Sequence, residues 1–322
     1  MSKNLRRLTI LLAAVCVMMI MAVPAFADAG NGYYEIGSPT QYSASATINV
    51  KLSIQSRAYS DTDGTLINTV INVPLTGKTT YYVRDVLLKY NTMSTGIQAY
   101  NSSGQLLTEN DNFVSAFKKG TRNYSYLFFA DIGNGEGRIP VDGWMFRVNG
   151  QCPLTENSPT NGPQGAFIDE TPVANGDVVT FYFTCPFEIN STDFSAKFVS
   201  ADSTYSNNVL TISLKSCKEN HYDLSQNGKW TFTMGACNSY TVTTPTGILY
   251  DANFNQKSTI YFSATTGVGM KNISLTPGTY YIYVPSTQDW VTRQAYDWFS
   301  GTTLVSCPVL KSTAVFDRIV IQ

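Results

Sequence analysis

The segment YYVRDVLLKY at residues 81–90 is the clearest helix signal in the chain, and the strands near it decide the fold. Its apolar side chains recur at the i, i+3, i+4 and i+7 spacing of one helix face: Val83, Val86, Leu87 and Tyr90. The segment TINVKLSI at residues 47–54 alternates apolar with polar residues and predicts a half-buried strand. A second extended run covers residues 66–75. A helix that follows such strands can pack across a small sheet.

The rest of the first half carries further strand and turn signals. Strands are predicted at residues 144–148 and 178–184. The first of these ends at Asn149-Gly150, a dipeptide typical of tight turns. A weaker helix pattern covers residues 112–119, and residues 189–195 are predicted to be a linker.

The second half repeats short strands that are separated by Gly, Pro and Asn, and this pattern favours a β-sandwich over residues 196–322. Residues 288–299 fit a helical face instead, and residues 317–322 are predicted to form a final strand. The short strands expected here are at residues 209–214, 229–233, 240–243, 259–262 and 280–284.

Three segments of the first half, taken in order, carry a family resemblance. They are TYYVRDVLL at residues 80–88, GWMFRVNG at residues 143–150 and NGDVVTFYF at residues 175–183. Together they resemble a bacterial domain of unknown function related to the C-terminal domain of transcobalamin and intrinsic factor, within the soluble-ligand-binding β-grasp superfamily. The resemblance covers residues 46–188. It implies an α+β fold, a small β-grasp-like domain, and a corrinoid as a candidate ligand.

A second resemblance rests on YDANF at residues 250–254 and ISLTPGTYYIYV at residues 273–284. These segments resemble the bacterial pre-peptidase C-terminal domain, a β-sandwich attached to secreted proteins, over residues 229–285. The loop holds Asp251 without a second acidic partner, so the resemblance implies no metal site.

Residues 1–27 have the three parts of a secretory signal peptide. Lys3, Arg6 and Arg7 are positive, an apolar run follows from Leu8, and Ala25-Phe26-Ala27 supplies small residues before the cleavage site. We therefore expect a secreted or cell-surface protein whose mature chain begins at Asp28 and has no transmembrane segment. Residues 28–45 form a lead-in to the first domain.

The mature chain is expected to carry a net charge of 19 − 23 = −4, since the signal peptide removes three of the 22 basic residues. Without a basic surplus there is little to neutralise phosphates, which argues against a nucleic-acid partner. Five cysteines remain in the mature chain, and an exported protein can keep disulfides. We predict that Cys152 pairs with Cys185 and Cys217 with Cys237, which leaves Cys307 over. The alternative is that all five are reduced.

Aromatic residues at one strand supply the candidate binding site. Trp144 and Phe146 alternate on one face of the strand at 144–148. Together with Asn149 and Tyr182 they are the predicted ligand-binding residues. Packing in the core of a small sheet is the alternative explanation for the aromatic face.

No catalytic or metal constellation stands out in the sequence. His221 is the only histidine, so a histidine-based triad or a zinc site lacks ligands. Asp61-Thr62-Asp63-Gly64 is predicted to be a hairpin turn and not a calcium loop. A hydrolase would need two of the scattered carboxylates to converge. These carboxylates are Glu109, Asp111, Asp142, Asp169, Glu170 and Asp177.

We therefore expect a non-enzymatic binding or cell-surface interaction protein without a cofactor. Its partner is predicted to be an extracellular ligand, a polysaccharide or a surface protein. The alternatives are capture of a small corrinoid-like ligand by the first domain and an accessory role in polysaccharide processing. A broad exposed Tyr/Thr face would favour surface interaction, whereas an aromatic pocket around Trp144 would favour ligand capture.

Overall fold

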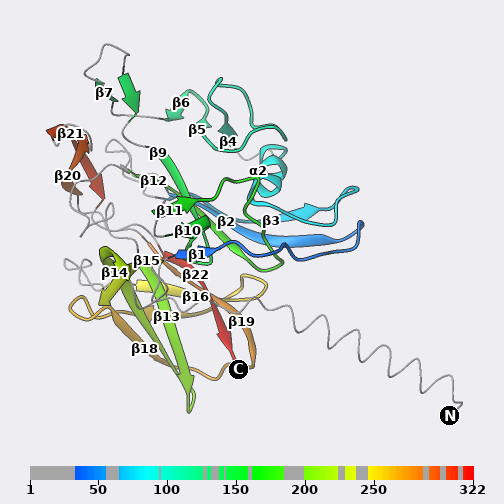
Figure 1. The fold of residues 1–322 in the computed structure, drawn as a ribbon. Helices are drawn as coiled ribbons and strands as arrows, with labels where there is room; N and C mark the ends of the chain where they lie inside the picture. Colours follow the sequence, from blue (N-terminus) through cyan, green and yellow to red (C-terminus); the bar gives the residue numbers. More distant parts are fainter. Residues whose placement is uncertain are drawn as a thin grey trace, which may run out of the picture.

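The computed structural model shows a protein built mostly from β-strands (Figure 1). We call residues 33–184 the first half and residues 199–322 the second half. The structure describes residues 33–55, 65–93, 96–125, 129–131, 138–140, 143–158, 162–184, 199–223, 229–236, 246–285, 290–297, 302–310 and 315–322.

A four-stranded sheet covered by one helix forms the centre of the first half (Figure 1). The strand order is β3-β2-β12-β9, in which β2 and β12 are parallel and the two outer pairs are antiparallel. The predicted helix and all four predicted strands named above for this half are confirmed. Their bounds are β2 (Thr47–Gln55), β3 (Thr65–Pro74), α2 (Val83–Asn91), β9 (Gly143–Val148) and β12 (Val178–Thr184).

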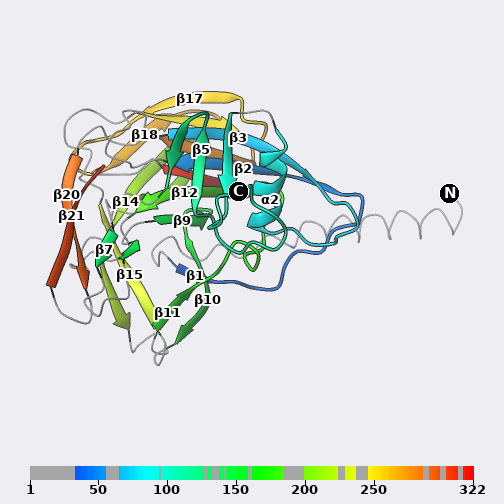
Figure 2. The same ribbon diagram turned by 90° about the horizontal axis from the view of Figure 1, so that it is seen from above.

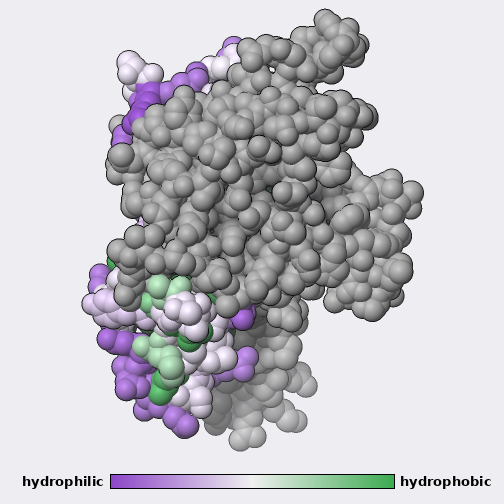
Figure 3. Space-filling model, turned by 90° about the vertical axis from the view of Figure 1, so that its left-hand side faces the viewer, coloured by the Kyte–Doolittle hydropathy of each residue, from purple (hydrophilic) through white to green (hydrophobic). Residues whose placement is uncertain are grey.

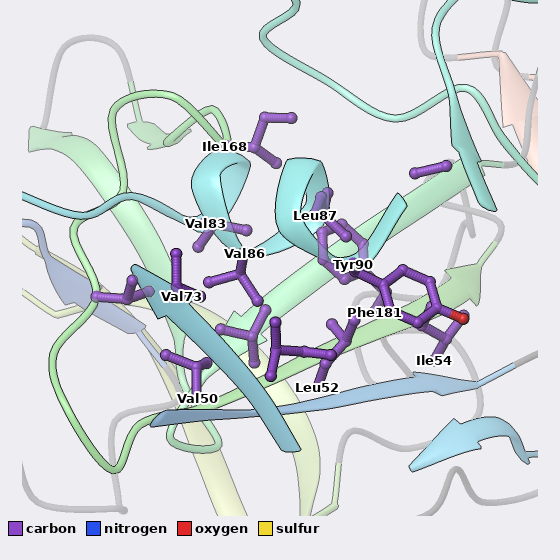
Figure 4. Close-up of a cluster of buried hydrophobic side chains, with 14 of the residues drawn as sticks. Val50, Leu52, Ile54, Val73, Val83, Val86, Leu87, Tyr90, Ile168 and Phe181 are labelled. Carbon is purple, nitrogen blue, oxygen red and sulfur yellow. The ribbon is translucent and has the colours of Figure 1, made fainter. Parts of the chain in front are cut away.

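The alternation of β2 explains why α2 packs on one face of this sheet. Four β2 side chains that point toward the helix are fully buried: Ile48, Val50, Leu52 and Ile54. They meet the apolar helix face of Val83, Val86, Leu87 and Tyr90 (Figure 4). Burial of one such side chain stabilises a fold by ~1.5–3 kcal/mol, so this contact fixes the helix on the sheet.

Shorter strands extend the first half, and one of them corrects a prediction. The helix expected over residues 112–119 is wrong, because Ala116–Lys119 forms β5 between β4 and β6. Phe117 is fully buried opposite Tyr124, and this packing overrides a weak helical pattern. The shorter strands are β1 (Tyr33–Glu35), β4 (Ile97–Tyr100), β5 (Ala116–Lys119), β6 (Arg122–Tyr124), β7 (Phe129–Asp131), β8 (Arg138–Pro140), β10 (Cys152–Ser158) and β11 (Gly162–Gly165).

Two sheets enclose a separate core in the second half. In one sheet β14 pairs with β13, β15 and β18, and the other sheet has the order β17-β16-β19-β22. Residues from both sheets meet in one apolar cluster that includes Ile212, Ile260 and Ile282. The strands are β13 (Val199–Ser206), β14 (Val209–Asp223), β15 (Lys229–Ala236), β16 (Thr246–Asp251), β17 (Gln256–Tyr261), β18 (Val268–Asn272), β19 (Gly278–Val284) and β22 (Val315–Ile321).

A strand pair replaces the helical face that was expected over residues 288–299. Trp290–Asp297 forms β20, which pairs antiparallel with β21 (Thr302–Leu310). Both views place this pair at one side of the molecule, near β7 (Figures 1 and 2). The final strand is confirmed as β22. The predicted turn at 61–64, the strand at 240–243 and the linker at 189–195 lie outside the described residues.

Candidate functional site

Trp144 and Phe146 lie on the α2 side of β9, at the edge of the first core. The indole Nε1–H of Trp144 donates to the carbonyl oxygen of Tyr124 at 2.9 Å, and its ring meets Phe117 edge-on with centroids 4.7 Å apart. Phe146 stacks on Phe181 at a centroid distance of 5.4 Å. Both predicted residues are half-buried. They therefore contribute to core packing, and part of each aromatic ring stays accessible to solvent.

The other two predicted binding residues lie elsewhere. The Tyr182 ring is on the opposite face of the sheet, where the guanidinium carbon of Arg147 lies 4.8 Å from its centroid. Asn149 occupies the predicted turn at φ +51°. Its Nδ2 donates to Asp177 Oδ1, and its Oδ1 accepts the N–H of Val178, each at 2.9 Å. The structure thus brings Trp144 and Phe146 together but not the four predicted residues.

Cys152 carries a free thiol, so the predicted disulfide between Cys152 and Cys185 is not formed in this structure. The Sγ of Cys152 lies 3.8 Å from the hydroxyl of Tyr182. Burial raises the pKa of the Cys152 thiol, which the charge of Arg147 and the Tyr182 hydroxyl partly oppose. Cys185 and Cys237 lie outside the described residues. In the strand register, Cys217 of β14 is the partner of Met234 of β15, and Cys307 of β21 is the partner of Arg293 of β20.

The scattered carboxylates of the first half that the structure describes have structural partners. Asp111 accepts from the N–H and hydroxyl of Thr108 at 2.7 and 2.8 Å, and Asp169 lies 3.5 Å from Arg84. Asp177 belongs to the contact between the halves, and Asp142 lies outside the described residues. His221 is a strand residue opposite Thr231. Within the described ranges, no group of three or more His, Cys, Asp or Glu side chains is placed to hold a metal ion.

A buried polar contact joins the two halves. Arg318 Nη1 lies 3.3 Å from Asp177 Oδ1, and both side chains are nearly inaccessible. The hydroxyl of Tyr281 donates to the carbonyl oxygen of Gly176 at 2.9 Å. Asp317 of the second half is also buried, lies close to Gly150 of the first half, and accepts the N–H of Ala201 within its own half at 2.7 Å. Removal of one partner from a buried ion pair is strongly destabilising, so the halves hold each other in a defined orientation.

The outer side of the second half presents two of the most exposed apolar side chains among the described residues. Tyr261 in β17 is 65% exposed and Met270 in β18 is 64% exposed. Their strand neighbours Phe262 and Gly269 face the core and form a β-bridge, which sets Tyr261 beside Met270. The two exposed side chains therefore lie next to each other on the surface.

Threonines flank this pair on both sides. Thr246 in β16 is the register partner of Tyr261, and Thr211 in β14 is the partner of Met270. We call these four residues the Tyr261 face. On the side of the second half that Figure 3 shows, hydrophobic residues are likewise grouped among hydrophilic ones.

Comparisons of the chain with protein-family models, curated proteins and solved structures found no match. Among the described residues, no helix has the length and apolar character that are needed to cross a membrane.

Proposed function

We propose that this protein is a secreted or cell-surface binding protein without enzymatic activity, and that it contacts an extracellular polymer through the Tyr261 face. We further propose that its first half is a β-grasp-like domain and its second half a β-sandwich. Helix α2, packed across a sheet with a parallel central pair, supports the first assignment. The two sheets around a shared apolar core support the second.

The observation that carries the proposal is the exposure of Tyr261 and Met270 side by side between threonines. A large apolar side chain on a folded surface loses contact with water when a partner covers it, and an aromatic ring can stack on an apolar face of a sugar. Threonine hydroxyls both donate and accept hydrogen bonds, which suits the hydroxyl groups of a polysaccharide. Export by the predicted signal peptide would bring this face to such a partner.

Sedimentation with insoluble polymers tests this proposal. The mature chain, residues 28–322, is mixed with cellulose, chitin or purified bacterial cell wall, and the bound fraction is measured. We expect binding to at least one polymer. In Tyr261→Ser the affinity should fall about tenfold, because a stacked aromatic ring contributes ~0.5–1.5 kcal/mol in addition to the free energy gained by burying its surface. Phe167→Ser is the matched control, because Phe167 is 47% exposed but lies in the first half.

Capture of a small soluble ligand by the first half is the second candidate function. The half-buried pair of Trp144 and Phe146, held beside Phe117 and Phe181, favours it. Equilibrium dialysis against a corrinoid tests this candidate. Saturable binding that is lost in Trp144→Ala would support ligand capture, and no binding at about 100 µM, a free energy weaker than roughly −5.5 kcal/mol, would remove it.

A further inference from the structure

Lys51 is a buried lysine at the contact between the two halves. Its neighbours in β2, Val50 and Leu52, face the first core, so the Lys51 side chain points to the opposite face of the sheet. There it is only 7% exposed, although lysine is almost never this buried unless it is paired. Its backbone N–H donates to the carbonyl oxygen of Asp177, the residue before β12, at 2.8 Å.

Two phenyl rings of the second half surround the Lys51 ammonium. The Nζ atom lies 4.5 Å from the ring centroid of Phe254 and 4.8 Å from that of Phe316. These distances are within the range of cation–π attraction, which grows when the cation is desolvated. The rings also contact Tyr281, which stacks on Phe254 at 4.5 Å. The ammonium is therefore clamped between aromatic groups that belong to the other half of the chain.

The loop that carries Phe254 is held rigidly. Phe254 has φ +60°, an unfavourable conformation for a bulky residue. Asp251 stabilises it, since Asp251 Oδ1 accepts the N–H groups of Asn253 and Asn255, each at 2.9 Å. The N–H of Phe254 itself donates to the carbonyl oxygen of Asp251 at 2.9 Å. These hydrogen bonds within residues 251–255 hold the backbone that carries the phenyl ring and involve no residue of the first half.

The charged groups on the elements around Lys51 have other contacts. Just before β12, Asp177 pairs with Arg318 of β22. At the end of β16, Asp251 accepts the backbone N–H groups of Asn253 and Asn255. On β22, Asp317 accepts from Ala201 and faces the charge of Arg147 of β9. The tyrosines Tyr250, Tyr281 and Tyr283 complete the aromatic surroundings. Among the described residues, no carboxylate lies within ion-pair distance of the Lys51 ammonium.

We propose that Lys51, Phe254 and Phe316 form a proton-operated latch, which holds the two halves together more tightly when the Lys51 amine is neutral than when it is charged. Separation of the halves returns the ammonium to water, whereas closure removes its hydration and replaces it only in part by the two rings. Closure therefore favours loss of the proton. Burial accordingly lowers the pKa of Lys51 from 10.5 to about 8.

The direction of the pH response follows from the difference between the pKa of Lys51 in the closed state and its pKa in the open state. Lys51 binds fewer protons in the closed state than in the open state between about pH 8 and pH 10.5, so closure strengthens as the pH rises through this window. Below about pH 8 the amine is charged in both states, and its contribution is constant. The opening constant should fall about tenfold between pH 7 and pH 9.

Hydrogen exchange of the full mature chain tests the latch. Exchange of backbone amides in β2 and β22 is measured at pH 7 and pH 9 and corrected for the intrinsic rate of exchange. We expect about tenfold less opening at pH 9 in the wild type. Lys51→Met keeps the apolar stem without the charge, so its opening should not depend on pH. Lys51→Arg stays charged, so it should be open to the same extent at both pH values.

Lys118→Met is the matched control, because the Lys118 ammonium lies 4.0 Å from the Tyr100 ring within the first half. This variant should keep the wild-type response. Equal opening of the wild type at both pH values would overturn the latch, as would a full wild-type response in Lys51→Met. If Lys51→Met does not fold, the NMR titration of the Lys51 side chain in the wild type decides. A midpoint near 8 supports the latch, and an ordinary lysine midpoint overturns it.

Discussion

Gly150 lies at a close contact between the two halves, where there is no room for a larger side chain. It follows Asn149 in the turn after β9 and has φ +80°. A Cβ at this position would lie 2.6 Å from Asp317 Oδ1. The Asn-Gly dipeptide predicted the turn correctly, because its backbone preference is local. The approach of Asp317 was not predictable from the sequence, since it depends on a strand at the far end of the chain.

Replacement of Gly150 by alanine should weaken the fold through this contact. Gly104→Ala is the matched control, because Gly104 has φ +72° but no atom within 4 Å of an added Cβ. The control should lose ~1–2 kcal/mol from the left-handed backbone alone. Gly150→Ala should lose about 1–3 kcal/mol more, since Asp317 or the turn must shift. Urea unfolding of both variants measures the difference, and equal losses would mean that the two halves do not meet at Gly150.

The elements of the first half were largely predictable, and those that failed did so for a physical reason. The spacing of Val83, Val86, Leu87 and Tyr90 predicted α2 correctly, because apolar residues at i, i+3, i+4 and i+7 match the period of a helix and not of a strand. The short segment around Phe117 became a strand, since its partners lie on other strands. The alternation of apolar and polar residues in β2 predicted that one face of this strand is exposed to solvent. The second half covers part of that face, which is why Lys51 is buried.

The loop between β16 and β17 should depend on the side chain of Asp251. Asp251→Ala removes the acceptor of two backbone N–H groups, and Phe254 then loses the support for its unfavourable φ angle. We expect a loss of ~1–3 kcal/mol in the free energy of unfolding. Asn253→Ala keeps the backbone N–H that Asp251 binds and serves as the control. A thermal or urea melt of Asp251→Ala that matches this control would contradict the role of the carboxylate.

At the scale of the whole molecule, the contact between the halves makes stability depend on pH through Asp317. Burial raises the pKa of Asp317 to about 6, against the charge of Arg147 and the N–H of Ala201. An acid whose pKa is raised by folding contributes stability at low pH, and this contribution is lost as the pH rises from about 4 through about 6.

Asp317→Asn should therefore be more stable than the wild type at pH 7.5, by at most about 3 kcal/mol. The advantage should shrink toward pH 4.5, where the wild-type carboxyl is protonated. Urea unfolding of both proteins at the two pH values measures the difference, in which the other titrating groups cancel. An advantage that is the same at both pH values would show that the Asp317 carboxyl does not titrate in this range.

The proximity of the candidate site residues was predictable within one strand but not between strands. Trp144 and Phe146 share a strand face, so their proximity was predictable from alternation. Tyr182 is one residue out of phase with Phe181 of the core, and it therefore lies on the other face of the sheet. The Tyr261 face joins residues from four strands, and its composition follows from the register of those strands rather than from any local motif.

The most direct test of the proposed function is one binding isotherm to purified bacterial cell wall, compared among three proteins. They are the mature wild type, the double variant Tyr261→Ser/Met270→Ser and Trp144→Ala. If the Tyr261 face binds the polymer, the wild type and Trp144→Ala should bind equally, and the double variant should bind at least about tenfold more weakly. Binding that is unchanged in the double variant, or that disappears in Trp144→Ala, would contradict the proposal.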